Sequence, residues 1–415
     1  MMLRISLFLA LLFSSTRVAP TNAATYPLPS SVSGDDDFTQ LVAWMRLHGG
    51  RVDHRIDVAE MNGIRGIVAL EEIEDGAELL HCSWNLVIGS TGLQDQMQLS
   101  SHAMCKIVQD MADEIKLGSE SLWWPYLKHI EIPRLSAMWG QSALDELQGL
   151  SPSEDATRHI QWFTQSCAGG AKVEDLDQET MHALVSFITR ASEVGMVPIY
   201  DLINHHNGKK NAKLILAQEG VHLRVVDGPI KEGQEIFLSY GVKSSSTMYR
   251  DYGFVEDWPS IWNWKDQVSG GNLAFVLLPD GVAAINPTKD FLMQIWHSHS
   301  NTDIQSRASS HMKSLPLEES TRFATAVRDH RNHLPTTLTE DLLILEQKQE
   351  ELLHVAQTLT PGNSAHFIGQ TFQILRDSIS AIEYRILFKK ALQSALVSAE
   401  NAAEAQREKI SGQEF

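Results

Sequence analysis

Cysteine is scarce in this chain: of its 415 residues only Cys82, Cys105 and Cys167 carry a thiol. The odd number and the wide spacing do not match a disulfide framework or a zinc cluster. The chain also lacks an Asn-x-Ser/Thr glycosylation site, since Pro287 follows Asn286 in the nearest match. Both absences favour a mature protein that is not extracellular.

Several catalytic and cofactor motifs are also missing. There is no GxSxG turn for a serine nucleophile, no GxGxxG after a strand-like run and no GxxxxGK[ST] phosphate loop. The pair His205-His206 has no HxxxH or CxxC nearby, and adjacent side chains on a strand point to opposite faces. These absences argue against a serine hydrolase, a P-loop enzyme and a metal site.

The charge balance excludes a further class. With 52 acidic and 34 basic residues, the formal net charge is −18. A nucleic-acid binder usually presents a basic face, so we expect no nucleic-acid partner. The apolar content of 43% and the length of 415 residues predict a globular protein of two domains.

The first residues have the pattern of a targeting segment. Arg4 precedes an unbroken apolar run, Leu7–Phe13, and small residues follow at Ala23 and Ala24. This predicts a cleaved signal peptide over residues 1–23, because the run is too short to span a membrane stably. The protein is therefore expected to enter the secretory pathway. No acidic residue occurs before Asp35, which also suits a plastid reached through that pathway.

Hydrophobic spacing predicts an α+β fold. A helix is expected over residues 37–49, and two short strands over 66–82 surround a turn at Asp75-Gly76. Residues 95–190 show helical spacing, and strand patterns return in "AKLILA", "VHLRVVDG" and "QEIFLSYG". From about residue 288 the pattern is helical again. The β core is thus predicted to assemble from pieces that are distant in sequence.

A series of motifs then suggests a family. The chain contains "NGIRGIVALEEIEDGAELL", "LWWPYLKHI", "FITRAS", "VPIYDLINHHNG", "IKEGQEIFLSYGVKSSSTMYRDYGFVED", "LPTTLTEDLLILE" and "AIEYRILFKKAL", in this order. The series resembles the SET-domain protein methyltransferases, in the branch of the Rubisco large-subunit lysine methyltransferase. The combination of "DLINH" with "SYG…DYGF", about forty residues apart, is its most specific part.

The resemblance implies a domain plan. It predicts a SET domain over residues 38–257, made of short β-sheets with a pseudoknot and a helical insert at about 95–190. An all-helical lobe over 270–400 would bind the protein substrate. The implied protein is a monomer with no stable membrane span.

The resemblance also implies site residues, and S-adenosylmethionine as the cofactor. Tyr240 would be catalytic. The remaining roles fall into two groups: cofactor contacts at Gly63, Ile64, Arg65, Gly66, Arg190, Asn204, His205 and Phe254, and substrate contacts at Asp201, Tyr240 and Tyr252. Simpler interpretations remain for some of these residues. Arg190 is also explained as an exposed helix end, Asp201 as a turn residue and His205 as a core histidine, while His206 is expected to be exposed and without a role.

The implied reaction is methyl transfer to a lysine side chain of a non-histone protein. It needs no metal, but it needs a neutral amine held in line with the methyl group and sulfur. A histidine acceptor fits the same family. A catalytically inactive SET-like binding module is an alternative of another class, favoured if cofactor binds without turnover. A secreted helical binding protein would leave the ordered motifs unexplained.

Overall fold

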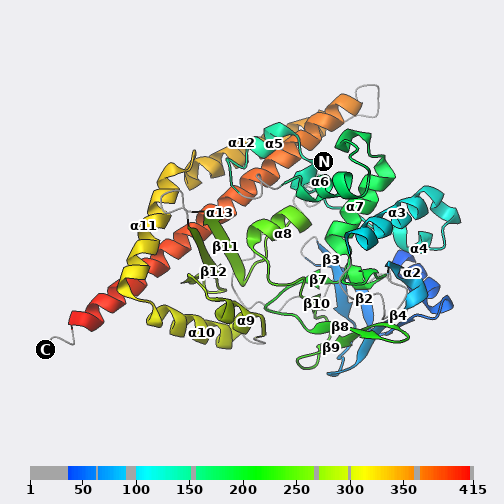
Figure 1. The fold of residues 1–415 in the computed structure, drawn as a ribbon, viewed down its shortest axis with the longest axis horizontal. Coiled ribbons are helices and arrows are strands. Elements are labelled where there is room, and N and C mark those ends of the chain that lie inside the picture. The colour runs from blue at the N-terminus through cyan, green and yellow to red at the C-terminus, as the bar shows by residue number, and fades with distance from the viewer. Residues whose placement is uncertain are drawn as a thin grey trace, which may run out of the picture. The chain divides into compact units, whose positions relative to one another are not determined.

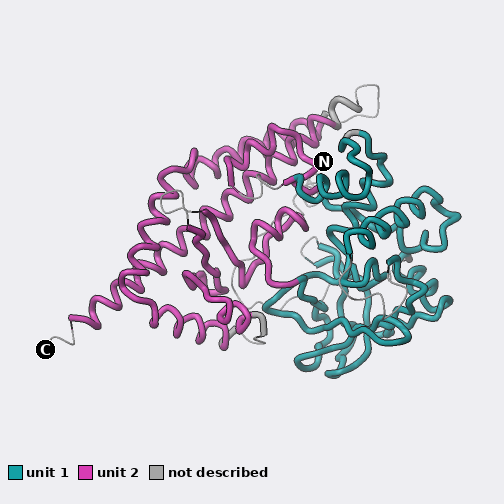
Figure 2. Tube along the Cα trace, viewed as in Figure 1, with its two compact units in different colours: residues 1–133, 157–240 teal, residues 134–156, 241–415 magenta. Residues whose placement is uncertain are grey.

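The computed structural model describes residues 36–61, 64–89, 100–150, 156–265, 271–297, 301–358 and 365–411. The chain divides into two compact units (Figure 2). Unit 1 comprises Met1–Pro133 and Thr157–Tyr240, and unit 2 comprises Arg134–Ala156 and Gly241–Phe415. The predicted signal peptide and Gly63 lie outside the described residues. The two units differ from the domain limits expected from the sequence. Residues 134–156 of the predicted insert group with the C-terminal part.

Unit 1 is built around small β-sheets (Figure 1). Its main sheet has the order β1-β4-β9-β8, with every neighbouring pair antiparallel. Three two-stranded pairs accompany it: β2 with β3 and β5 with β6, both antiparallel, and β7 with β10, which is parallel. The strands are β1 (Arg51–Val52), β2 (Ile56–Met61), β3 (Ile64–Ala69), β4 (Glu78–Ser83), β5 (Ile88–Gly89), β6 (Gly195–Met196), β7 (Asn204–His205), β8 (Ala212–Ala217), β9 (Gly220–Val225) and β10 (Phe237–Leu238).

The α-helices in the described part of unit 1 are α2 (Asp36–Leu47), α3 (Ser101–Leu117), α4 (Trp124–Leu127), α6 (Arg158–Ser166) and α7 (Gln178–Arg190). The two longest begin at side-chain caps. Ser100 accepts a hydrogen bond from the main-chain N–H of Ala103, and Asp177 accepts one from Thr180. Their apolar faces are buried, and α3 packs against α7. The predicted helical character is thereby confirmed over residues 100–150 and 156–190, the described part of the range 95–190.

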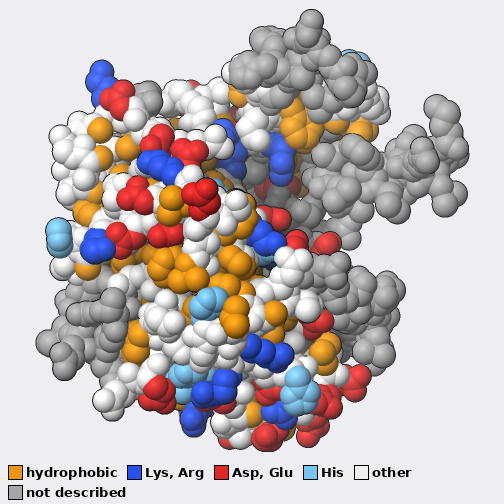
Figure 3. Space-filling model, turned by 90° about the vertical axis from the view of Figure 1, so that its right-hand side faces the viewer, with side chains coloured by type: hydrophobic (Ala, Val, Ile, Leu, Met, Phe, Trp, Pro, Cys, Tyr) orange, Lys and Arg blue, Asp and Glu red, His pale blue; other side chains and the backbone are white. Residues whose placement is uncertain are grey.

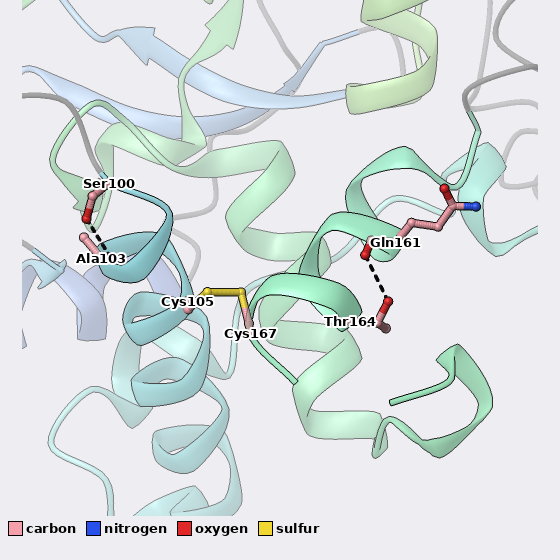
Figure 4. Close-up of a disulfide and its surroundings, with 6 residues drawn as sticks. All are labelled: Ser100, Ala103, Cys105, Gln161, Thr164 and Cys167. Carbon is pink, nitrogen blue, oxygen red and sulfur yellow. Dashed lines mark hydrogen bonds between the residues drawn. A yellow bond between two sulfur atoms is a disulfide. The ribbon is translucent and has the colours of Figure 1, made fainter. Parts of the chain in front are cut away.

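A disulfide joins Cys105 on α3 to Cys167, just after the end of α6 (Figure 4). The cysteine pattern argued against a disulfide framework, and it gave no prediction for a single disulfide. The two residues are 62 positions apart, so spacing alone gave no sign of the pair. Cys82, the free cysteine among the described residues, is buried in β4.

Unit 2 contains a second sheet that the sequence pattern did not predict. Strands β11 (Ser260–Lys265), β12 (Asn272–Leu277) and β13 (Ala283–Ile285) form an antiparallel sheet in that order. The lobe predicted to be all-helical from residue 270 therefore begins with strands. The helices of this unit are α5 (Gln141–Asp145), α8 (Ser245–Tyr252), α9 (Lys289–His297), α10 (Asn301–Ser314), α11 (Leu317–His333), α12 (Leu338–Thr358) and α13 (Ala365–Ser411).

Helix α13 organises unit 2. At 47 residues it is about 70 Å long, and in Figure 1 it runs past the sheet and alongside α11 and α12. Tyr384 and Phe388 of α13 lie against the ring of Trp262 on β11, with ring centroids 6.0 and 5.6 Å away. Farther along, Ala395 and Ala399 are fully buried, and their small side chains allow close packing.

Buried charges connect three helical segments of unit 2. Asp341 at the start of α12 accepts hydrogen bonds from Arg385 and Lys389 of α13, at 2.7 and 2.5 Å. Arg385 also donates to Oε2 of Glu146, next to α5, at 2.9 Å. Burial alone would raise the pKa of Asp341, but the hydrogen bonds from Lys389, Thr336 and Arg385 outweigh it and keep the pKa below its ordinary value. The carboxylate therefore stays ionised in the interior.

Lysine and arginine side chains lie among acidic ones on the face drawn in Figure 3. Within the described ranges, no helix combines the length and the apolar character needed to cross a bilayer. The absence of a nucleic-acid partner remains a prediction from the net charge.

We expect the disulfide to stabilise unit 1. Closing a loop of 62 residues restricts the unfolded chain by about 4 kcal/mol in the entropic model, and measured values run from about 2 to 5 kcal/mol. Replacing Cys105 and Cys167 by alanine should therefore raise hydrogen exchange in α3 and α6. Reductant should have the same effect on the wild-type protein and none on the double variant. Equal exchange in all samples would contradict a stabilising role.

Candidate active site

The segment "IYDLINHHNG" begins with strained backbone. Ile199 has φ 68° and is fully buried, although a β-branched residue rarely adopts positive φ. A single 3₁₀ turn, Tyr200–Leu202, follows and leads directly into β7. Such strain persists only where the surrounding packing enforces it, and it is often found at functional sites.

Asn204 connects β7 to β3. Its Nδ2 donates to the main-chain carbonyl of Arg65 at 3.0 Å and to Oε1 of Glu235 at 2.7 Å. Asn204 and His205 pair in parallel with Phe237 and Leu238 of β10. The side chain of Asn204 therefore joins β3 to the residues that precede β10 and Tyr240.

Tyr240 and His205 are joined by a hydrogen bond and a ring contact. The main-chain N–H of Tyr240 donates to Nδ1 of His205 at 2.8 Å, and the two rings lie 5.0 Å apart. The Tyr240 hydroxyl donates to the carbonyl of Ile203 at 2.7 Å. Because Nδ1 accepts, the neutral His205 ring carries its proton on Nε2. The structure thus brings together the predicted catalytic tyrosine and the predicted Asn-His pair.

His206 was expected to be exposed, and this was wrong. Its side chain is buried, its ring meets Phe237 edge-on at 5.4 Å, and its Nδ1 accepts from the N–H of Gly208 at 3.1 Å. Burial, with smaller contributions from Lys209 and His205, lowers the pKa of His206 to about 3. A neutral His206 is therefore a core residue of the turn after β7.

Asp201 lies in a buried polar group next to these residues. Its Oδ2 accepts from the Tyr126 hydroxyl at 3.0 Å, and Nη1 of Arg190 donates to its main-chain carbonyl at 2.9 Å. Nη2 of Arg190 donates to the carbonyl of Glu131 at 2.7 Å. The Asp201 side chain has no exposed surface. Burial raises the pKa of Asp201, although Arg190 and the Tyr126 hydrogen bond oppose this effect, and burial also raises the pKa of Tyr126.

Two atoms of this group have no partner. Nε of Arg190 and Oδ1 of Asp201 are buried and make no hydrogen bond to any described residue. One is a donor and the other an acceptor, so the pair suits a ligand or water that carries both functions. Arg190 is therefore not an exposed helix end, and Asp201 does more than hold a turn.

Ile64, Arg65 and Gly66 form the start of β3, and Gly66 lies next to Asn204 and Glu235. Ile64 of β3 is 54% exposed, and the side chain of Arg65 donates to the carbonyl of His129 at 3.3 Å. A Cβ at Gly66 would approach Oε1 of Glu235 to 2.4 Å and Nδ2 of Asn204 to 2.7 Å. A side chain at position 66 would therefore force the side chains of Glu235 and Asn204 to move.

Tyr252 and Phe254 belong to unit 2. Tyr252 ends α8, and Gly253 follows in the left-handed conformation with φ 82°. The rings of Tyr252 and Phe254 lie 6.3 Å apart, and Nζ of Lys243 lies 5.8 Å from the centre of the Tyr252 ring. Burial, then the charge of Asp251, raises the pKa of Tyr252 to about 12.

Two residues of the site were not singled out from the sequence. Tyr126 lies in an apolar run of helical spacing, where a tyrosine has the signature of an ordinary core residue. Glu235 follows a glycine turn, where acidic residues are common. Their roles depend on contacts with Asp201, 75 positions away from Tyr126, and with Asn204, 31 positions away from Glu235.

The fold is that of known SET-domain structures. A crystal structure of the SET domain of LSMT bound to lysine and AdoHcy matches with 16% identity and a TM-score of 0.50, over 89% of this chain and 92% of that chain. The structure of Rubisco LSMT bound to sinefungin and monomethyllysine gives 16% and 0.50, over 88% and 92%. The SET domain of LSMT bound to MeLysine and AdoHcy gives 14% and 0.52, over 88% and 92%. No protein-family model and no curated protein sequence matches the chain.

The Tyr126–Asp201 hydrogen bond should be a measurable source of stability. Tyr126→Phe removes the donor to a buried carboxylate and should lower the free energy of unfolding by about 1–3 kcal/mol. In an Asp201→Asn background the same change should cost less, because a hydrogen bond to a neutral amide oxygen is weaker. Urea unfolding of the four proteins of this cycle measures the difference. An equal cost of Tyr126→Phe in both backgrounds would show that the two side chains do not interact.

Proposed function

We propose that the protein is an S-adenosylmethionine-dependent methyltransferase that modifies a lysine side chain of a non-histone protein. The observation that carries the proposal is the contact of Tyr240 with His205, which follows Asn204 on β7, in a chain with the SET fold. The solved structures of this fold are named as complexes with AdoMet or AdoHcy and with lysine or methyllysine.

The residues present fit this cofactor. An amino-acid end group needs donors for its carboxylate and acceptors for its ammonium. Arg190 Nε and Asp201 Oδ1 are a buried donor and a buried acceptor without partners among the described residues. Asn204 supplies a further acceptor, Oδ1. When bound, S-adenosylmethionine supplies a methyl group on a sulfonium sulfur whose positive charge is lost on transfer.

Tyr240 is the residue placed to assist the transfer. Its only hydroxyl proton is donated to Ile203, so its oxygen can interact with a third group only as an acceptor. Such an acceptor can orient an N–H of the amine or a C–H of the methyl group that carries positive charge. The amine must be neutral to attack, which a desolvated environment favours.

The helical part of unit 2 is proposed to dock the protein substrate. Helices α12 and α13 expose apolar side chains there, with Leu342 44%, Leu343 55% and Ile374 50% accessible. Exposed apolar side chains on helices suit protein contacts. Within unit 1, Tyr240 and Asp201 are the proposed substrate contacts.

The function is tested by cofactor binding and by transfer. Calorimetry should show that S-adenosylmethionine binds, and a chelator should not abolish the binding. In the described ranges no group of three His, Cys, Asp or Glu side chains is arranged to hold a metal ion. Methyl-labelled cofactor and an extract of the protein's own cells should then yield a labelled protein. Label on histidine would identify the alternative acceptor. Binding without any transfer would favour a non-catalytic module, and no binding would refute the proposal.

Tyr240→Phe should reduce methyl transfer severely while cofactor affinity changes little. The ring and its contact with His205 remain, but the hydroxyl is lost, at a cost of about 0.5–1.5 kcal/mol in stability. The loss of a positioned polar group should slow methyl transfer on the order of tens- to thousands-fold. Single-turnover rates measure the effect, with Tyr249→Phe as control. Its hydroxyl donates to the carbonyl of Ser380 within unit 2. Equal turnover in wild type and Tyr240→Phe would remove Tyr240 from the mechanism.

The compartment is proposed to be oxidising and reached through the secretory pathway, with a plastid on that route as the alternative. The disulfide between Cys105 and Cys167 supports this, since disulfides persist mainly in such compartments. Mass spectrometry of the native protein should find an N-terminus near residue 24 and an oxidised Cys105–Cys167 pair. An intact Met1 together with two free thiols would contradict the proposed route. A start nearer Asp35 would favour the plastid.

A further inference from the structure

Glu235 is a half-buried acid at the edge of the candidate site, and the proposed reaction does not use it. Its Oε1 accepts from Asn204 Nδ2 at 2.7 Å, and burial raises its pKa, although the Asn204 hydrogen bond and Lys209 oppose this. Its main chain is fixed on both sides. The carbonyl of Glu235 accepts from Nδ2 of Asn211 at 2.9 Å, and the next N–H, of Ile236, donates to Ile67 at 2.8 Å. The carboxylate is thus held in one place by β3 and by Asn211.

The two contacts of Asn204 decide which way its amide group faces. The Arg65 carbonyl and the Glu235 carboxylate are both acceptors, and both contact the same terminal atom of the Asn204 side chain. An oxygen there would face two other oxygens, so that atom must be the nitrogen. Both protons of Nδ2 are then used within the protein. Oδ1 is left without a hydrogen-bond partner among the described residues, and the half-buried side chain presents it as an acceptor.

We propose that Glu235 is a positioning residue for the cofactor: it fixes the amide of Asn204 so that Oδ1 is presented to the ammonium of the cofactor's amino-acid end. This rests on the proposed function. An acceptor next to a carboxylate favours a cationic donor over a neutral hydroxyl. The ammonium is the only cationic N–H donor of the cofactor. If Glu235 offered no acceptor, one proton of Asn204 would lose its partner and the amide would be able to turn over.

Gly66 supports the same geometry. The missing Cβ leaves room for the Glu235–Asn204 contact, since any Cβ would lie 2.4 Å from Oε1 of Glu235. The contact is therefore enclosed by β3 on one side and by β7 and the residues before β10 on the other. Solvent does not compete from the Gly66 side.

Two substitutions of Glu235 by side chains of similar volume distinguish the loss of the hydrogen-bond acceptor from a change in packing. Glu235→Gln keeps an oxygen that accepts from Asn204, whereas Glu235→Met removes it. The ligands are S-adenosylhomocysteine, which has the ammonium, and 5′-methylthioadenosine, which lacks the amino-acid end. Glu235→Met should weaken S-adenosylhomocysteine binding by about tenfold, with less than about threefold change for 5′-methylthioadenosine. Glu235→Gln should stay within about threefold of wild type for both. Glu232→Met, an exposed change on the same turn, is the control.

A second measurement does not need a ligand. The side-chain amide protons of Asn204, observed by NMR, should exchange slowly with water in the wild type and in Glu235→Gln, and faster in Glu235→Met. Unchanged affinity in Glu235→Met, or an equal loss for both ligands, would overturn the positioning role. If the wild type binds neither ligand, the proposed function fails, and the amide-proton exchange alone decides the role of Glu235.

Discussion

The candidate site depends on the close contact of Gly66, Asn204 and Glu235. These residues come from three chain segments: β3, β7 and the residues before β10. The side chain of Asn204 bonds to the main chain of the first and to the carboxylate of the last. A Cβ at Gly66 would approach both partners to less than 3 Å. The parallel pairing of β7 with β10 places His205 beside Leu238, and this pairing brings Tyr240 within hydrogen-bonding distance of His205. Tyr240 is thus held in place by contacts that begin at Gly66.

In unit 2 the main constraint is the register of the 47-residue helix α13 against its neighbours. Apolar packing alone along a long helix permits sliding, because neighbouring turns resemble one another. The buried carboxylate of Asp341 removes this freedom, since Arg385 and Lys389 must both reach it from successive turns of α13. Buried charges of this kind contribute little net stability compared with apolar side chains, but they are costly to separate. The cluster therefore specifies one alignment of α12 and α13, at the place where substrate docking is proposed.

Much of this architecture was accessible from the sequence. The helical pattern from about residue 288 agrees with α9–α13, and the resemblance carried by the "DLINH" and "SYG" motifs assigned Asn204, His205 and Tyr240 to one site, where Tyr240 and His205 are in contact. What failed has physical causes. The strands β11–β13 are only 6, 6 and 3 residues long, and runs this short are hard to tell from other apolar segments by periodicity. The disulfide joins cysteines 62 residues apart, and the pairing depends on how α3 and α6 pack. His206 is polar by type, and only the turn at Gly208 and the ring of Phe237 bury it.

Tyr240 and Asn204 share one property that the sequence motif does not reveal. Tyr240 donates its hydroxyl proton to Ile203, and Asn204 donates both of its amide protons to Arg65 and Glu235. Each side chain has therefore used its donors within the protein, and each can offer a ligand only oxygen lone pairs. A set of acceptors with a carboxylate behind it stabilises positive charge. Both the sulfonium of a methyl donor and the ammonium of its amino-acid end are positively charged. The folded chain thus selects for cationic groups through the direction of its own internal hydrogen bonds, before any ligand is present.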